Sequence, residues 1–127
     1  MATRQSFTAS QVLTAAEQNA LATAMIAINA QTGTTYTTVL SDDGKLITCS
    51  NAASISVTVP PFSSVAYGIG TQINIAQLGA GTVTITAGAG VTLNSAGTKL
   101  KLDAQYAVAT CVKTDTNTWF VVGNLKA

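Results

Sequence analysis

Short runs of β-forming residues, separated by turn residues, fill the sequence from Tyr36 to the C-terminus. Within the runs, apolar and polar side chains alternate with a period of two, the pattern of strands with one buried face. The runs recur about every 8 to 12 residues without helical segments between them, which predicts a sandwich or small barrel rather than a parallel sheet with crossover helices. We expect strands at Tyr36–Leu40, Lys45–Cys49, Ser54–Val59, Thr71–Gln77, Thr82–Thr86, Val91–Leu93, Lys99–Leu102, Ala107–Lys113 and Thr118–Gly123.

The turns between these runs have identifiable chemistry. Ser41–Gly44 contains aspartates that hydrogen-bond to their own backbone and a glycine that tolerates positive φ. Pro60 and Pro61 end a strand, because neither residue can donate to a ladder. Asp115–Asn117 separates two strongly β-forming runs and predicts a terminal hairpin.

The first third of the chain has a different pattern. Thr14 and Glu17 form a capping box, in which the two side chains satisfy free backbone N–H groups at a helix start. One helical face then carries apolar residues at spacings of four and three: Leu21, Met25 and Ile28. We expect a helix over Thr14–Asn29, with Gly33 ending the helical region.

This change of pattern divides the chain into two parts. We expect an N-terminal arm and helix over residues 1–35 and a β-sandwich domain over residues 36–127. A short helix with a narrow apolar stripe needs a surface to pack on. Two roles are open for it: it covers one end of the β domain, or it anchors the chain to a partner or to copies of itself.

Three Gly-x-Gly pairs raise the question of a phosphate-binding loop: Gly68/Gly70, Gly79/Gly81 and Gly88/Gly90. A dinucleotide fingerprint needs another glycine three positions on and a following helix, because the pyrophosphate binds at the helix N-terminus. Those positions hold Ile73, Thr84 and Leu93, and each pair leads into an expected strand. No Gly-Lys-Ser/Thr sequence of a P-loop is present either. We therefore interpret the glycines as turn residues.

The chain contains no histidine, which excludes Ser-His-Asp and Cys-His arrangements. Its acidic residues are few, and most fall in turns: Glu17, Asp42, Asp43, Asp103 and Asp115. Glu17 is explained by the capping box. Asp42 and Asp43 could offer oxygen atoms to Ca²⁺, but no Asp-x-Asp-x-Asp-Gly loop follows them. We predict that the protein is not an enzyme and expect neither a cofactor nor a bound metal.

The two cysteines, Cys49 and Cys111, each lie inside an expected strand without a neighbouring His or Cys, which argues against a metal cluster. We interpret them as small buried thiols. A disulfide between them would require adjacent strands, because bonded cysteines keep their Cα atoms within about 7 Å. The sequence leaves that pairing open.

One strand carries a threonine ladder, because Thr82, Thr84 and Thr86 share one of its faces. Such a ladder could bind ordered water or sugar, but Thr is also the ordinary solvent-facing β former. No repeat in the sequence extends the ladder as a solenoid would. Trp119 is expected to anchor the core. The tyrosines are spread too widely to form a sugar platform: Tyr36, Tyr67 and Tyr106.

Only 9% of the residues are charged, against about 25% in an average soluble domain. The net charge of +1 comes from scattered basic residues without a basic stripe, which argues against nucleic acid as a partner. The most apolar helical stretch, Ala20–Ile28, is far shorter than the roughly 20 residues that span a bilayer. The start of the chain lacks the apolar segment of a secretory signal. We expect a soluble protein without membrane insertion.

Several stretches resemble bacteriophage virion proteins. FTASQVLTAAEQNALATA resembles the opening of phage tail-fibre and virion structural proteins, in which such a segment begins a short helix. TYTTVLSDDGKLITCSNAASISVTVPP and GTQINIAQLGAGTVTITAGAGVTL resemble a β module of phage fibre and decoration proteins, and AVATCVKTDTNTWFVVGNL resembles its terminal hairpin. The resemblance implies an antiparallel, jelly-roll-like β-sandwich that assembles as a homotrimer and has a structural or adhesive role.

This resemblance gives three functional hypotheses. The leading one is a capsid decoration (cement) protein of the virion, bound to the major capsid protein through the N-terminal arm. The first alternative is a small tail fibre or fibre-tip protein that contacts tail proteins and a receptor on the host surface. The second alternative is a bacterial carbohydrate-binding or adhesin module, which would explain the sandwich but not the opening segment.

Overall fold

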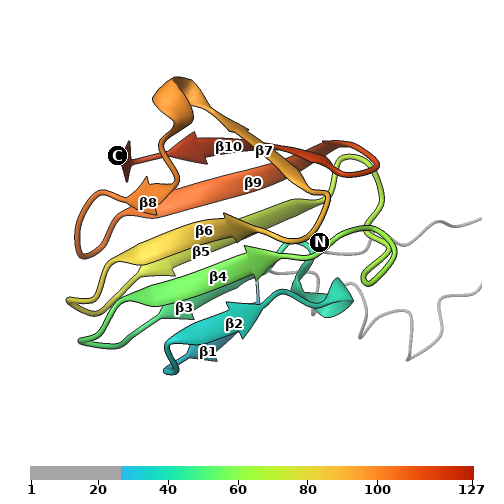
Figure 1. Ribbon diagram of the computed structural model, residues 1–127. Coiled ribbons are helices and arrows are strands. Elements are labelled where there is room, and N and C mark those ends of the chain that lie inside the picture. The colour runs from blue at the N-terminus through green and yellow to red at the C-terminus, as the bar shows by residue number, and fades with distance from the viewer. Residues whose placement is uncertain (1–26) are drawn as a thin grey trace, which may run out of the picture.

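A computed structural model of the protein describes residues 27–127, and Figure 1 shows them as two facing β-sheets. One sheet has six strands in the order β1-β3-β5-β9-β10-β7, and the other has five in the order β11-β8-β6-β4-β2. The strands are β1 Ile28–Gln31, β2 Thr35–Thr37, β3 Leu46–Cys49, β4 Ile55–Val59, β5 Gln72–Gln77, β6 Val83–Ala87, β7 Thr92–Ser95, β8 Lys101–Leu102, β9 Val108–Asp115, β10 Thr118–Gly123 and β11 Leu125–Lys126. Two 3-10 turns are η1 Leu40–Asp42 and η2 Ala96–Thr98.

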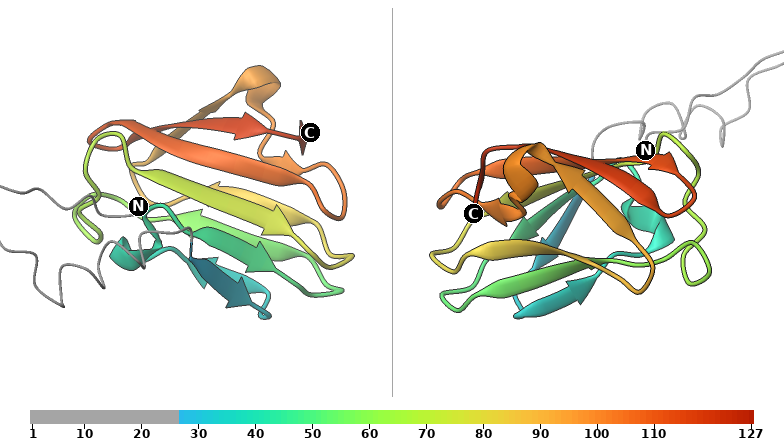
Figure 2. Two further views of the ribbon diagram at one scale, coloured as in Figure 1. Left: turned by 180° about the vertical axis from the view of Figure 1, so that it is seen from behind. Right: turned by 45° about the horizontal axis from the view of Figure 1, so that its top comes forward.

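The first six strands wind as three coils: β1–β2, β3–β4 and β5–β6. Each coil crosses from the six-stranded to the five-stranded sheet, so like strands of successive coils pair in parallel. Ile28 pairs with Leu46, and Leu46 with Asn74, in the six-stranded sheet. The view from behind in Figure 2 shows β1, β3 and β5 side by side. The described chain thus begins as a short two-sided solenoid.

The later strands close the third coil with mostly antiparallel pairs. β9 pairs antiparallel with β5, and β10 forms the hairpin partner of β9. β8 pairs antiparallel with β6, and β11 with β8, which extends the five-stranded sheet. β7 is the exception, because it runs parallel to β10 at the far edge of the six-stranded sheet. β9 and β8 thus pair with the backbone N–H and C=O groups of β5 and β6 that the third coil would otherwise leave unpaired.

The turns of successive coils touch each other through their backbones. Asn51 donates from its side chain to the carbonyl of Thr32 at 2.8 Å, and its own carbonyl accepts from Gly81 N–H at 2.8 Å. A Cβ at Gly81 would lie 1.9 Å from the carbonyl oxygen of Ala53. Close approach between coils therefore requires glycine at this position.

The core lies between the sheets and follows from the period of two. Alternate residues on β4 and β6 are buried, as are the inward residues of β3, β5, β9 and β10. The rings of Tyr67 and Trp119 meet edge to face with centroids 5.4 Å apart, the geometry that aromatic quadrupoles favour. The expectation that Trp119 anchors the core is confirmed.

The mainly β prediction is confirmed, but the prediction of antiparallel sheets is wrong. Both sheets are mixed, and the parallel winding of the coils departs from the order of a jelly roll. A period of two indicates a strand with one buried face whether its neighbours run parallel or antiparallel. The pattern therefore could not reveal the parallel pairing. The hairpin at residues 115–117 and the end of β4 before Pro60 are confirmed.

The expected helix Thr14–Asn29 falls mostly outside the described residues, because the structure describes only the part after residue 26. Its last residues, Ile28 and Asn29, belong instead to β1, which pairs with β3. β1 thus precedes residue 36, where we expected the β domain to begin. The strand expected at Tyr36–Leu40 ends at Thr37, and η1 follows.

Candidate functional site

The outward face of the six-stranded sheet carries several exposed apolar side chains. Phe120 is 50% exposed, Val108 44% and Val122 41%. Six apolar residues point outward from this sheet, and we call them the apolar face: Ile28, Leu46, Val108, Val112, Phe120 and Val122. Cross-strand pairing puts uncharged Thr, Asn, Gln and Ala residues between them. A sheet face whose outward side chains are uncharged and partly apolar can serve as a contact surface.

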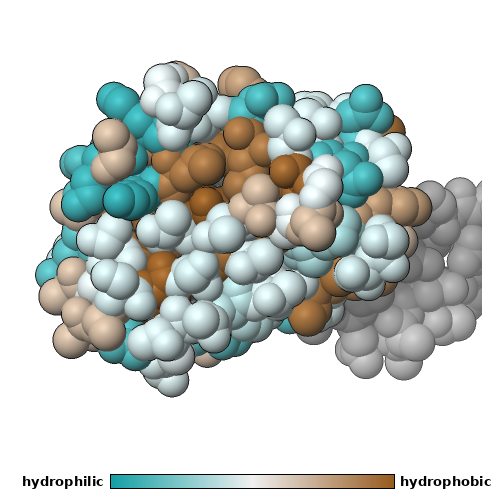
Figure 3. Space-filling view, viewed as in Figure 1, coloured by the Kyte–Doolittle hydropathy of each residue, from teal (hydrophilic) through white to brown (hydrophobic). Residues whose placement is uncertain are grey.

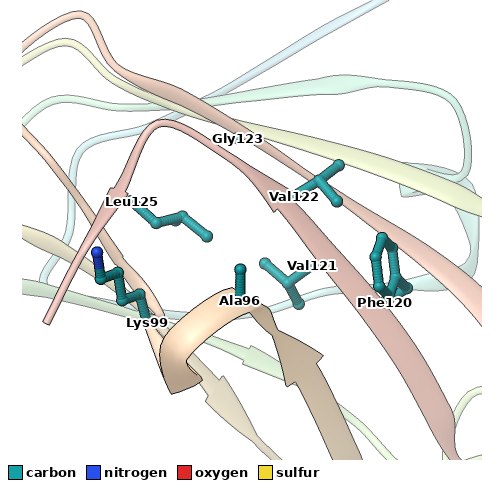
Figure 4. A pocket seen from close by; sticks show the side chains of 7 residues that line it. All are labelled: Ala96, Lys99, Phe120, Val121, Val122, Gly123 and Leu125. Carbon is teal, nitrogen blue, oxygen red and sulfur yellow. The ribbon is translucent and has the colours of Figure 1, made fainter.

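A hollow of about 280 Å³ adjoins the apolar face where η2 leaves β7. Its walls are mostly apolar: Ala96, Phe120, Val121, Val122 and Leu125. Lys99 supplies a cation at the rim, and Figure 4 shows its side chain beside Leu125 and Ala96. Phe120 and Val122 belong both to this hollow and to the apolar face. Figure 3 shows further apolar side chains reaching the surface between β7 and β8, next to η2.

Asp42 is fully buried inside the first coil, although the sequence placed it in a turn. Its carboxylate accepts from Asn29 Nδ2 at 2.8 Å, from the Tyr36 hydroxyl at 2.6 Å and from Val39 N–H at 2.9 Å. Burial and the hydrogen bond to Asp42 raise the pKa of Tyr36 to about 12. We call Asn29, Tyr36 and Asp42 the polar plug. It places hydrogen-bonded polar side chains inside the first described coil.

The other acidic residues do not converge on a site. Asp43 follows η1, Asp103 follows β8, and Asp115 accepts from Thr116 N–H at 2.8 Å in the hairpin turn. Within residues 27–127, no group of three His, Cys, Asp or Glu side chains could hold a metal ion. Glu17 lies outside the described residues.

The interpretation of the cysteines as buried thiols is confirmed. Cys49 on β3 and Cys111 on β9 are both free and fully buried. β5 lies between their strands. The strands are therefore about 10 Å apart, twice the strand spacing, which is too far for a disulfide. Burial raises the pKa of Cys49 to about 11 and that of Cys111 to about 12.

The threonine ladder is longer than the sequence indicated. The outward residues of β2 and β4 continue it across the sheet, so that three parallel strands carry hydroxyl groups in register. We call these the hydroxyl rows: Thr35–Ser56–Thr84 and Thr37–Thr58–Thr86. Thr82 itself precedes β6. The sequence could have revealed the rows as a repeated Thr/Ser-x-Thr in Thr35–Thr37, Ser56–Thr58 and Thr84–Thr86, but coils of unequal length conceal the repeat.

Lys113 is a functional candidate that sequence reasoning missed. Its side chain is 2% exposed, and its ammonium donates to the carbonyl of Tyr67 at 2.6 Å. The same ammonium lies 4.5 Å from the centroid of the Phe62 ring. Burial lowers the pKa of Lys113, while Asp115 acts in the opposite direction. A carbonyl and an aromatic face satisfy a charge but offer no reacting partner, so Lys113 ties the loop after Pro61 to the core.

Comparison with known proteins finds no family model, no curated protein and no solved structure that matches the chain. Among the described residues, no helix is long and apolar enough to cross a membrane. Among residues 27–127, three surfaces are candidates for function: the apolar face, the adjoining hollow and the hydroxyl rows.

Proposed function

We propose that the protein is a non-enzymatic structural component of a bacteriophage virion that assembles as a homotrimer. In this proposal it is a capsid decoration protein, and residues 1–35 attach it to the major capsid protein. The phage-like sequence segments support the virion assignment. The apolar face supports self-association, and it is the observation that carries the proposal.

The physical argument begins with the cost of leaving the apolar face in water. Removing apolar surface from water stabilises an association by about 25 cal/mol for each Å² buried. The residues of the apolar face are uncharged, since Lys113 of β9 points inward and Asp115 lies at the hairpin turn. Burying the face therefore requires little desolvation of charge. Most soluble homo-oligomers have closed symmetry, so we expect copies that meet through this face to form a closed oligomer.

Charge insertion into the apolar face tests the assembly. Phe120→Lys places an ammonium on the apolar face at β10 and should shift the protein from a trimer toward a monomer of 12.9 kDa, measured by light scattering at several concentrations. Ile69→Lys is the matched control, because Ile69 is 72% exposed but lies in the loop before β5. A wild-type protein that is monomeric at high concentration would contradict self-association.

Labelling the protein on intact virions tests its location. A decoration protein should coat the head densely, because it binds a repeated capsid lattice. Label confined to a few copies at the tail would overturn the decoration role in favour of the second candidate, a small tail fibre protein. The hydroxyl rows favour that second candidate, since an exposed polar array is a surface able to contact a host receptor.

A further inference from the structure

The hydroxyl rows form a regular two-dimensional array on the outward face of the five-stranded sheet. Thr35, Ser56 and Thr84 are cross-strand neighbours, and the second row repeats this arrangement two residues on. Neighbouring strands are about 4.8 Å apart, and alternate residues of one strand about 6.7 Å apart. The inward residues between them are core residues such as Val57 and Ile85, so the hydroxyl groups point away from the core.

The array is held in place by its own contacts. The hydroxyl groups of Ser56 and Thr86 lie 2.8 Å apart and link the two rows. β-branched threonines on a paired strand have few χ1 rotamers, so their hydroxyl groups keep fixed positions. A partner that binds such groups orders few side chains and loses little entropy on binding.

Positive charge adjoins one side of the array. Thr84 pairs with Lys101, and Lys101 pairs with Lys126, so the first row continues directly into two lysines. Lys99 also lines the hollow, and its segment lies beside β6, because the N–H of Ile85 donates to the carbonyl of Leu100 at 2.8 Å. These three lysines are half of the six basic residues of the chain. Figure 3 shows the surface over β2, β4 and β6 as nearly neutral, with strongly hydrophilic side chains toward β8.

We propose that this face, the hydroxyl rows together with Lys99, Lys101 and Lys126, binds an acidic polysaccharide. Charge complementarity carries the choice of partner. The lysines contact carboxylates of the polymer, while the threonine and serine hydroxyl groups both donate to and accept from sugar hydroxyls. A nucleic acid fits less well, because three lysines neutralise too few phosphates for stable binding at physiological salt.

Other charged residues near the face do not reverse its positive net charge. Asp103 follows β8, two residues after Lys101, and its N–H donates to the carbonyl of Asn124. The strands that carry the hydroxyl rows contain no charged residue. The inference does not rest on the virion assignment or on trimer formation, since the apolar face is on the other sheet.

The test compares polymers that differ in charge, using the full chain. Polygalacturonate should bind the wild-type protein, and the neutral polymer dextran should bind at least tenfold more weakly, measured by isothermal titration calorimetry. Raising the salt concentration should weaken the binding of polygalacturonate, because exposed charges are screened. Equal binding of the two polymers, or no binding of polygalacturonate, would overturn the proposal.

Variants separate the role of the lysines from that of the hydroxyl groups. Lys101→Gln should weaken binding about tenfold and Thr84→Val about threefold, the losses expected for a charged and a neutral hydrogen bond. Lys45→Gln, before β3, and Thr92→Val, on β7 of the other sheet, are the matched controls and should bind as the wild type does. Circular dichroism and the fluorescence of Trp119 check that each variant is folded.

Two outcomes of this series would contradict the assignment. If Thr84→Val and Thr58→Val bind like the wild type while a short DNA duplex binds as tightly as polygalacturonate, the face attracts any polyanion and the hydroxyl rows play no part. If the control variants lose as much binding as the test variants, the polymer binds elsewhere. The measurements stay separate from the virion test, because they need neither a capsid nor a trimer.

Discussion

At the scale of single residues, the buried thiols should make the protein less stable as the pH rises into the alkaline range. An unfolded cysteine ionises near its ordinary pKa of about 8.5. In the folded protein the pKa values are about 11 for Cys49 and about 12 for Cys111. The unfolded state therefore binds fewer protons above about pH 8.5, so the free energy of unfolding falls there, by about 1.4 kcal/mol per pH unit for each thiol. Below that pH the contribution of the thiols is constant.

Cys111→Ala should flatten this pH dependence. The variant loses some stability at pH 7 through lost packing, but between about pH 8.5 and 10 its unfolding free energy should fall less steeply than that of the wild type. Urea denaturation followed by the fluorescence of Trp119 at a series of pH values measures both slopes. Parallel slopes for the two proteins would mean that Cys111 already ionises in the folded state.

Residue positions were predictable where they depended on local pattern, and not where a distant segment decided them. The period of two correctly placed Trp119 in the core. Lys113, the last residue of an expected strand, carried no prediction of burial. Its burial depends on the Tyr67 carbonyl and the Phe62 ring, which come from a loop far away in the sequence.

At the scale of elements, the stacking of turns decides how the strands pair. Most of the strands were predicted from the sequence, but not their parallel order. The inserted loop between β4 and β5 makes the coils unequal, so no fixed period shows in the sequence. β1 was missed because Ile28 continues the helical spacing of Leu21 and Met25. The glycine pairs were correctly interpreted as turn residues, but their contacts with neighbouring turns required the structure.

Gly81→Ala tests the importance of that stacking. The added Cβ would overlap the Ala53 carbonyl, so the turns of β3–β4 and β5–β6 must separate and the Asn51 hydrogen bond to Gly81 weakens. We expect a loss of about 2 to 3 kcal/mol in the free energy of unfolding, measured by urea denaturation. Gly68→Ala is the control, because nothing lies within 4 Å of its Cβ position, and it should change stability by no more than about 1 kcal/mol. Equal losses would show that turn stacking contributes little.

At the scale of the whole molecule, the two sheets give the protein two outward faces of different chemistry. The six-stranded sheet presents the apolar face, and the five-stranded sheet presents the hydroxyl rows with their lysines. Self-association through the first would leave the second exposed on every copy. An oligomer would then carry several copies of the hydroxyl rows. Simultaneous binding of one polymer by several copies would raise the overall affinity above that of a single copy.

The boundary between the arm and the β domain can be tested by two truncations. Removing residues 1–26 leaves every described strand in place, whereas removing residues 1–35 deletes β1 together with Asn29 of the polar plug. The shorter truncation should unfold at nearly the wild-type urea concentration. The longer one should lose at least 3 kcal/mol, because Asp42 then lacks a buried hydrogen-bond donor and β3 lacks its partner on one side.

The same pair of truncations separates folding from attachment. If residues 1–26 anchor the protein to the virion, the shorter truncation should be folded and yet fail to bind purified particles that lack the protein, as measured by co-sedimentation. Full binding by this variant would place the attachment site on the β domain. Equal stability of the two truncations would instead show that β1 and Asn29 are dispensable, so that the β fold needs only the residues after residue 35.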